Sequence, residues 1–261
     1  MLESRSVPGR SNPPPARSQL IHASALEETE RRALLQRTHA LEGQVFRSVE
    51  PFEAYAERVL GADHLWVWTL EDPGGRLVGY NVITYEQHDY LGKPIGVYRA
   101  NVALLPEYRG HNRTVATGLR LAIPRLVREP RRRLYFHAYL LHPSIYVMMD
   151  KYSEVMWPTP RTDPPPQDVV DLLGFFESRG GPPRWEPSNP WVVRLDTSVT
   201  ENDEETASWL RSDRPSARYF FARNPHYRQG GALALLVPLT LKNLMRAMLR
   251  VATQRFRRGK S

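Results

Sequence analysis

The sequence predicts an α/β fold in which a mixed, mainly antiparallel twisted sheet is flanked by helices. Three runs rich in β-branched and aromatic residues, at 64–70, 77–85 and 93–105, are separated by short polar turns, as in an antiparallel meander. Residues 97–152 then follow the order strand, basic turn, helix, strand, helix. Consecutive strands that lead into alternating helices and strands are typical of one sheet covered by helices.

The composition is that of a folded protein with a sizeable core. The chain has 261 residues, of which 41% are hydrophobic, enough for one large domain or for a domain with an appendage. Cysteine is absent, which excludes disulfides and thiolate metal sites. The histidines show no metal-ligand spacing, so no metal is expected. No secretory signal and no bilayer-spanning run is visible, and a cytoplasmic location is therefore expected.

The positive charge is uneven along the chain. The net charge is +8, and nearly all of the cations are arginines, a bias that more often reflects genome base composition than function. The basic residues lack the interleaved aromatic residues of a single-strand platform, so nucleic acid is not expected as a partner. Residues 241–261, however, contain seven cations and no acid.

The segments before the meander are expected to be one disordered stretch and two helices. Residues 1–19 are rich in Pro, Ser and Arg and are predicted to be disordered. Residues 23–42 are predicted to be helical, with Ser24 and Glu27 forming a capping box. A second short helix is predicted over residues 51–60.

The later segments continue the alternation. Beyond the basic turn we expect a helix at residues 114–129, a strand at 134–141 and a helix at 143–152. The remaining chain predicts a helix at 168–178, a strand at 191–195, a helix at 204–221 interrupted near Pro215, a strand at 232–239 and a helix at 240–258. The predicted organisation is a disordered segment (1–19), a core (20–160) and a C-terminal α/β extension (161–261).

Residues 105–114 carry a recognisable motif at the end of the third meander strand. They read Leu-Pro-Glu-Tyr-Arg-Gly-His-Asn-Arg-Thr. Together with its surroundings at residues 66–157, this stretch resembles the GCN5-related N-acetyltransferases of the acyl-CoA N-acyltransferase superfamily, as a divergent member. In that family a V-x-P-x-Y-R-G phrase leads into a [Q/R]-x-x-G-x-[G/A] turn that holds the coenzyme A pyrophosphate. Here Asn112 and Thr114 stand where the family prefers glycine or alanine.

The resemblance implies an enzyme that transfers an acetyl or longer acyl group from acyl-coenzyme A to an amine. It implies a third strand that spreads from its neighbour and binds the pantetheine arm and the oxyanion through Val102, Ala103 and Leu104. It also places His142 where the family often has an asparagine that contacts pantetheine. The implied pyrophosphate residues are Arg109, Gly110, His111, Asn112, Arg113, Thr114 and Val115. The alternative interpretation of this turn is an ordinary strand-to-helix connection with solvated arginines.

Candidate acid–base residues follow from the same resemblance. A tyrosine on the helix after the fourth strand often protonates the leaving thiolate, and here Tyr146 is the first candidate and Tyr152 the second. Strict alignment puts Met149 at that place, and both tyrosines are equally well interpreted as core residues. Glu86 and His88, at strand ends near the expected groove, are candidates for taking the proton of the amine.

Two further functions remain open from the sequence. The departures at Asn112 and Thr114 favour a non-catalytic binding module on the same scaffold. The C-terminal helix at residues 240–258 combines an apolar face with basic residues, so it either packs on the domain or lies on an anionic membrane surface.

Overall fold

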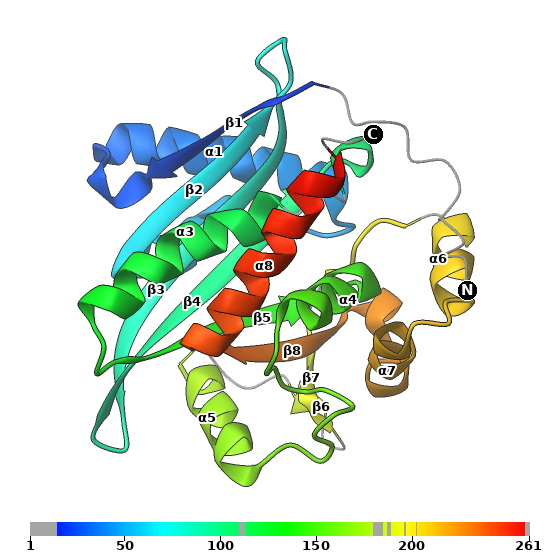
Figure 1. The fold of residues 1–261 in the computed structure, drawn as a ribbon. Coiled ribbons are helices and arrows are strands. Elements are labelled where there is room, and N and C mark those ends of the chain that lie inside the picture. The colour runs from blue at the N-terminus through cyan, green and yellow to red at the C-terminus, as the bar shows by residue number, and fades with distance from the viewer. Residues whose placement is uncertain are drawn as a thin grey trace.

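The computed structural model describes the backbone of residues 15–109, 113–179, 185–186, 189–195, 197–201 and 203–258 (Figure 1). Its strands form one eight-stranded sheet in the order β1-β2-β3-β4-β5-β8-β7-β6. Every neighbouring pair is antiparallel except β4 and β5, which run parallel. The predicted fold class, a mixed and mainly antiparallel sheet with helices, is confirmed.

The strands are β1 (Arg17–His22), β2 (His64–Glu71), β3 (Leu77–Tyr90), β4 (Lys93–Leu104), β5 (Arg133–Leu140), β6 (Trp185–Glu186), β7 (Asn189–Arg194) and β8 (Gly231–Pro238). The α-helices are α1 (Glu28–Val45), α2 (Phe52–Leu60), α3 (Arg113–Arg128), α4 (Pro143–Tyr152), α5 (Gln167–Glu177), α6 (Asp203–Leu210), α7 (Pro215–Arg223) and α8 (Leu241–Arg258). Short 3-10 turns lie at η1 (Ala23–Ala25), η2 (Pro106–Tyr108) and η3 (Tyr227–Gln229).

The helices cover both faces of the sheet. Tyr98 of β4 points to the face that α3 covers, and its hydroxyl donates a hydrogen bond to the Leu121 carbonyl. Side chains two residues apart share a face of a strand, so Arg99 and Asn101 both point to the opposite face. Arg99 there donates to the Phe176 carbonyl of α5, and Asn101 donates to Glu42 of α1. Figure 1 shows α3 and α8 in front of the sheet and α1 behind it.

Three elements differ from the sequence prediction near the N-terminus. Strand β1 begins at Arg17, inside the segment predicted to be disordered, because its backbone pairs with β2 along its whole length. Ser24 caps no helix, since its hydroxyl accepts a hydrogen bond from the Leu65 N–H at 2.7 Å, and α1 begins later, at Glu28. Strand β3 extends to Tyr90, so the segment predicted as the turn after it, beginning at Glu86, is mostly strand.

The C-terminal extension completes the sheet. β8 pairs with β5 on one side and with β7 on the other, and all of its residues from Gly231 to Val237 are buried. A strand buried on both faces reads as a continuous apolar run, as this one does. Strands β6, β7 and β8 of the predicted extension therefore belong to the same sheet as the strands of the predicted core. Among the described helices, none is long and apolar enough to cross a bilayer.

Asn243 connects the start of α8 to the rest of the fold by side-chain hydrogen bonds. Its Oδ1 accepts from the backbone N–H groups of Glu154 and Val155, at 2.7 and 2.8 Å. Its Nδ2 donates to the carbonyls of Val155 and Pro238, at 2.9 and 2.6 Å. Asn243 itself is 4% exposed, so its amide makes these bonds away from bulk water.

We therefore expect Asn243→Ala to lower the free energy of unfolding by about 2–4 kcal/mol, because it removes four hydrogen bonds to backbone groups of half-buried residues. Urea denaturation of the full chain measures this change. Thr253→Ala, at an exposed position on the same helix, is the control and should change the free energy by less than about 0.5 kcal/mol. Equal effects of the two variants would contradict a fastening role for Asn243.

Candidate active site

The central parallel strands β4 and β5 separate towards their carboxyl ends. Their pairing begins at Ile95 with Arg133 and ends at Arg99 with His137. Beyond that point β4 continues to Leu104, while β5 continues to Leu140 paired with β8 on its other side. The opening between residues 100–104 and 138–140 is called the β4–β5 gap below. The spreading of the third meander strand, expected from the resemblance, is present in the structure.

The register of β4 shows which backbone groups face this gap. The Leu105 N–H donates to the Val78 carbonyl of β3 at 3.0 Å, in continuation of the regular β3–β4 ladder. Because backbone groups of alternate residues point to opposite sides of a strand, the N–H of Ala103 also faces β3, and those of Val102 and Leu104 face the gap. The Leu104 carbonyl accepts from Nε of Arg109 at 3.1 Å. Of the three predicted oxyanion residues, two therefore direct an N–H into the gap.

Helix α3 begins close to the open end of the gap. Gly110, His111 and Asn112 of the predicted pyrophosphate turn lie outside the described residues, as does the side chain of Arg113. Thr114 and Val115 are half-buried in the first turn of α3. The described part of the turn is thus a helix start next to Arg109. Helix starts present unpaired N–H groups and the positive end of the helix dipole.

His142 lies at the carboxyl end of β5, across the gap from Arg109. It is the N-cap of α4, where its Nδ1 accepts from the Ser144 N–H at 3.2 Å and lies 2.6 Å from the Ser144 hydroxyl. Because Nδ1 accepts, the neutral ring carries its proton on Nε2. That nitrogen lies 3.4 Å from Oε1 of Glu201 and 3.8 Å from Oε1 of Glu205.

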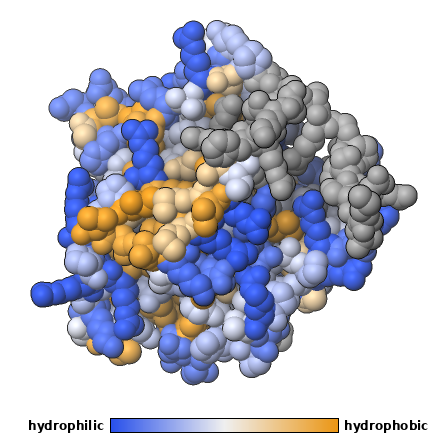
Figure 2. Space-filling model, in the orientation of Figure 1, coloured by the Kyte–Doolittle hydropathy of each residue, from blue (hydrophilic) through white to orange (hydrophobic). Residues whose placement is uncertain are grey.

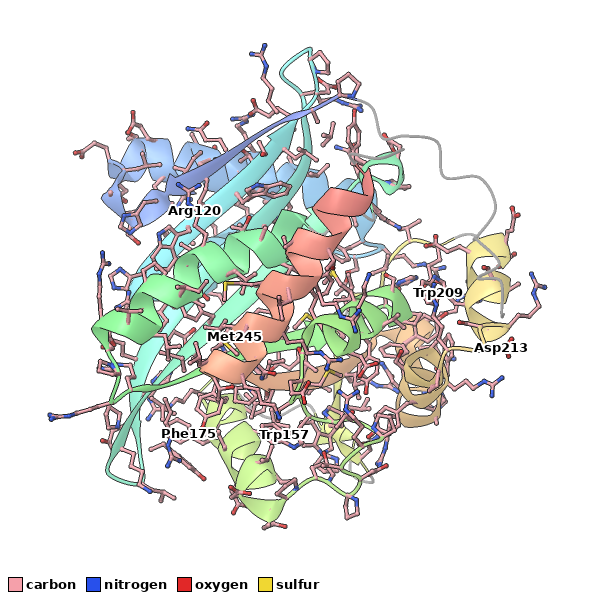
Figure 3. All side chains as sticks on the ribbon, viewed as in Figure 1. Arg120, Trp157, Phe175, Trp209, Asp213 and Met245 are labelled. Atoms are coloured by element: carbon pink, nitrogen blue, oxygen red, sulfur yellow. The ribbon has the colours of Figure 1, made fainter. Side chains whose placement is uncertain are left out.

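The His142 cluster is buried and its titration is shifted. Burial, aided by the Arg109 charge, lowers the pKa of His142 to about 4, so the ring is neutral at neutral pH. Burial also raises the pKa of Glu201, and the neighbouring carboxylate of Glu205 adds to that effect. Oε2 of Glu201 accepts from Thr206 and Tyr227, at 2.9 and 3.3 Å. Trp209 of α6, labelled in Figure 3, meets the His142 ring edge to face, with ring centroids 5.9 Å apart.

The chain between β7 and α6 joins the two sides of the gap. Residues 197–201, called the strap below, leave β7 on the β5 side and reach α1 on the β4 side. The Arg47 N–H donates to the Ser198 carbonyl at 2.9 Å, and the Thr200 N–H donates to the Val45 carbonyl at 3.0 Å. Phe46 and Val199 form an antiparallel bridge between these bonds. The strap therefore borders the gap on the α1 face.

A second buried carboxylate lies beside the gap and was not singled out from the sequence. Oε1 of Glu42 accepts from the Tyr80 hydroxyl and from Nδ2 of Asn101, each at 2.5 Å. Asn101 precedes Val102, whose N–H faces the gap. Burial, followed by the Glu42 charge, raises the pKa of Tyr80 well above its usual value, so this hydroxyl stays protonated and donates. A sequence signal existed, because Glu42 falls on the stripe of α1 that also holds Leu34, Leu35, Thr38, Leu41 and Val45.

Glu86 and His88 lie on the same face of the sheet as Asn101 and Glu42, but beside the part of β4 that is still paired with β5. Glu86 is opposite Val97 on β4, where β4 and β5 are still paired. Its Oε1 is 3.5 Å from Nε of Arg99, and Nε2 of His88 is 3.2 Å from its Oε2. Arg99 in turn donates to Nδ1 of the buried His137 at 2.6 Å. Glu86 is thus held by a guanidinium at the paired part of the strands, and its role as a base stays a prediction.

The two candidate tyrosines are engaged in the core. Tyr146 is fully buried, donates its hydroxyl proton to the Pro158 carbonyl at 3.0 Å and has a pKa raised by burial. Tyr152 is 3% exposed and packs in the cluster under α3 and α8 with Leu119 and Leu244. The described residues hold no group of three or more His, Cys, Asp or Glu side chains placed to bind a metal.

Comparison with known proteins finds similarity in structure. No protein-family model matches the sequence, and no curated protein matches it. A protein from Enterococcus faecalis, described as a probable N-acyltransferase, is 16% identical with a TM-score of 0.36, and the match covers 54% of this chain and 33% of that one. This chain therefore spans about a third of that protein.

Two further solved structures are N-acetyltransferases. The ribosomal-protein-S18-alanine N-acetyltransferase of Escherichia coli is 11% identical with a TM-score of 0.34, over 86% of this chain and 96% of that chain. NAA60 of Arabidopsis thaliana, solved with acetyl-CoA, is 16% identical with a TM-score of 0.35, over 54% of this chain and 87% of that chain. All three matches are distant likenesses in structure.

The lowered pKa of His142 has a consequence for stability. The unfolded chain takes up a proton at this histidine below about pH 6.5, whereas the folded chain does so only near pH 4, so its contribution to stability is lost as the pH falls between these values. We expect His142→Asn, which keeps an N-cap acceptor, to reduce the loss of unfolding free energy between pH 7.5 and pH 5 by about 2 kcal/mol. Urea titrations at the two pH values measure it.

The matched control for this prediction is His226→Asn, at an exposed histidine. This variant should show the same difference in unfolding free energy between pH 7.5 and pH 5 as the original chain. A His142→Asn variant with the full acid sensitivity of the original protein would contradict the assignment of a neutral, buried imidazole.

Proposed function

We propose that this protein is an acyl-CoA-dependent N-acyltransferase whose reaction takes place in the β4–β5 gap. The observation that carries the proposal is a parallel strand pair that separates inside the sheet, with the N–H groups of Val102 and Leu104 facing the opening. Unpaired strand edges are costly unless a ligand or another chain occupies them, and here the edge is internal.

The chemistry of acyl-coenzyme A fits such an opening. The pantetheine arm is extended and contains two amides, so it can add to the free edge of β4 as a strand would. At the open end, the start of α3 and the Arg109 guanidinium supply N–H donors and positive charge suited to the pyrophosphate. Arg109 is already positioned by its bond to the Leu104 carbonyl.

The reaction is direct attack of a neutral amine on the thioester carbon. The nitrogen–carbon bond forms while the carbonyl oxygen becomes an oxyanion, which the Val102 N–H stabilises. Glu42, bonded to the adjacent Asn101, takes the proton of the amine on the α1 face. The carbon–sulfur bond then breaks and the thiolate is protonated, with Tyr146 and Tyr152 as the predicted donors.

The amine side of the site is assigned to the α1 face. Glu42 and Asn101 lie on that face, and the strap borders it through its bonds to the end of α1. This leaves the start of α3, at the end of the gap, for the nucleotide part of the co-substrate. The acceptor and the donor thereby approach the thioester from different directions, as direct transfer requires.

Ligand binding to the two parts of the site can be measured separately by thermal shift. Acetyl-CoA should raise the melting temperature, and adenosine 3′,5′-bisphosphate should raise it by a smaller amount. Arg109→Ala should lower the apparent affinity for each of these two ligands by about three- to tenfold. The same variant should leave the response to pantetheine unchanged. Arg17→Ala, at an exposed arginine on β1, is the control.

No stabilisation by millimolar acetyl-CoA or by longer acyl-CoA would overturn the proposal. Stabilisation without turnover of any amine would favour the non-catalytic binding module that the departures at Asn112 and Thr114 left open.

Turnover tests the role of Glu42. With a panel of polyamines, amino acids and peptide N-termini as acceptors, thiol release from acetyl-CoA measures the rate. Glu42→Gln keeps an acceptor for Tyr80 and Asn101 but takes no proton, so kcat should fall about a hundredfold while KM for acetyl-CoA stays the same. Glu71→Gln is the control and should retain activity. Glu71 is the last residue of β2, and its carboxylate pairs with Arg37.

Glu201→Gln distinguishes the two carboxylates that border the gap. If Glu201→Gln rather than Glu42→Gln abolishes turnover, the base lies on the strap and the assignment of Glu42 is wrong. If both variants turn over like the original protein, neither carboxylate is the base.

A further inference from the structure

Helix α8 has two apolar faces, and one of them is turned to solvent. Leu244 and Ala247 are buried where α8 packs in the cluster that it shares with α3. A different set of large apolar side chains on the same helix is exposed: Leu241 by 64%, Met245 by 47%, Met248 by 39% and Leu249 by 67%. These four are called the α8 stripe. Packing on the domain therefore accounts for only part of the apolar surface that the sequence puts on this helix.

The α8 stripe is continuous along the helix. Its members are spaced four, seven and eight residues from Leu241, the spacing of a single helical face. Figure 2 shows an apolar area in the region of α8 and α3 with hydrophilic atoms beside it, and Figure 3 labels Met245 on the outer side of α8. Apolar surface gathered in this way on a soluble protein marks an interaction site.

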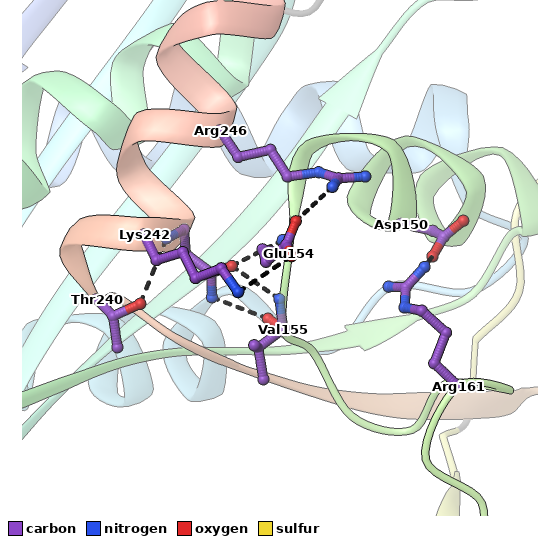
Figure 4. A network of polar contacts seen from close by, with 8 residues as sticks. Asp150, Glu154, Val155, Arg161, Thr240, Lys242 and Arg246 are labelled. Carbon is purple, nitrogen blue, oxygen red and sulfur yellow. Dashed lines mark hydrogen bonds and ion pairs between the residues drawn. The ribbon is translucent and has the colours of Figure 1, made fainter.

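A row of cations runs beside the α8 stripe. Lys242, Arg246 and Arg250 follow one another at four-residue spacing, on the side of the helix next to the stripe. The first two pair with Glu154, at 3.2 and 2.5 Å (Figure 4). One carboxylate therefore holds two cations in place and neutralises only one charge. From Leu241 to the end of the chain, the sequence contains seven cations and no acid.

We propose that α8 docks the protein on an anionic membrane surface. The helix lies parallel to the bilayer, with the α8 stripe in contact with the acyl region and the cation row at the level of acidic headgroups. The clamp at Asn243 and the pairs with Glu154 keep the helix in this orientation on the domain. This binding is independent of the acyltransferase proposal.

Charge favours a membrane over a second copy of the chain as the occupant. In a two-fold dimer that pairs α8 antiparallel with its copy, the cation rows of both copies would lie on the same side of the contact and repel each other. An acidic lipid surface instead offers opposite charge and an apolar interior next to each other, which matches the arrangement of the cation row and the α8 stripe.

Co-sedimentation of the full chain with lipid vesicles tests the proposal. The protein should sediment with vesicles of phosphatidylcholine and phosphatidylserine and should remain in solution with phosphatidylcholine alone or at high salt. Met245→Ser combined with Leu249→Ser should weaken binding to the anionic vesicles about tenfold or more, and Arg250→Glu about tenfold. All three positions are exposed, so the fold should be retained, which circular dichroism checks.

Two matched controls use exposed residues elsewhere. Leu91→Ser lies in the turn between β3 and β4, and Arg214→Glu lies at the start of α7; neither should change vesicle binding. Failure of the original protein to sediment with anionic vesicles would overturn the proposal, and so would equal losses in the control variants. A dimer in light scattering that the stripe variants dissociate, with vesicle binding unchanged, would assign the α8 stripe to contact between copies instead.

Discussion

The parallel pairing of β4 with β5, and its end at Arg99 and His137, is the constraint on which the rest of the site depends. Two antiparallel half-sheets meet at this pair, so the divergence of the strands opens the interior of the sheet. The polar network of Arg99, His137 and Glu177 lies at the last paired position, which stabilises the base of the gap. Because the pairing ends at this position, the Val102 N–H faces an opening and α3 begins at the end of that opening.

Two buried polar clusters border the gap in different ways. The Glu42 carboxylate accepts hydrogen bonds from two neutral donors, Tyr80 and Asn101, and it is the group that we propose as the proton acceptor. Glu201 is bonded by hydroxyl groups and faces the neutral His142 ring, in a cluster that ties α6 to the start of α4. Burial disfavours charge in this second cluster, because it lowers the pKa of His142 and raises the pKa of Glu201.

Local sequence patterns were sufficient for most helices and strands. Helix α4 follows the prediction from Pro143 to Tyr152, because proline suits the first helical turn and an apolar strand precedes it. The partners of Glu42 are 38 and 59 residues away, so spacing along the chain could not reveal them. Helical periodicity identified the apolar residues of α8 but could not show that α3 covers only one of two faces. The composition of residues 1–19 concealed β1, whose pairing with β2 is a long-range interaction.

The position of β8 has a consequence for where this chain can be shortened. β8 lies between β5 and β7, and it pairs with β5 from Tyr135 to Leu140. A fragment cut after residue 160, although it would contain the motif at residues 105–114, would leave that side of β5 bare in an apolar region. Open edges of this kind recruit strands from other molecules. Such a truncation would thus yield aggregates, because β6, β7 and β8 complete the sheet in which β5 lies.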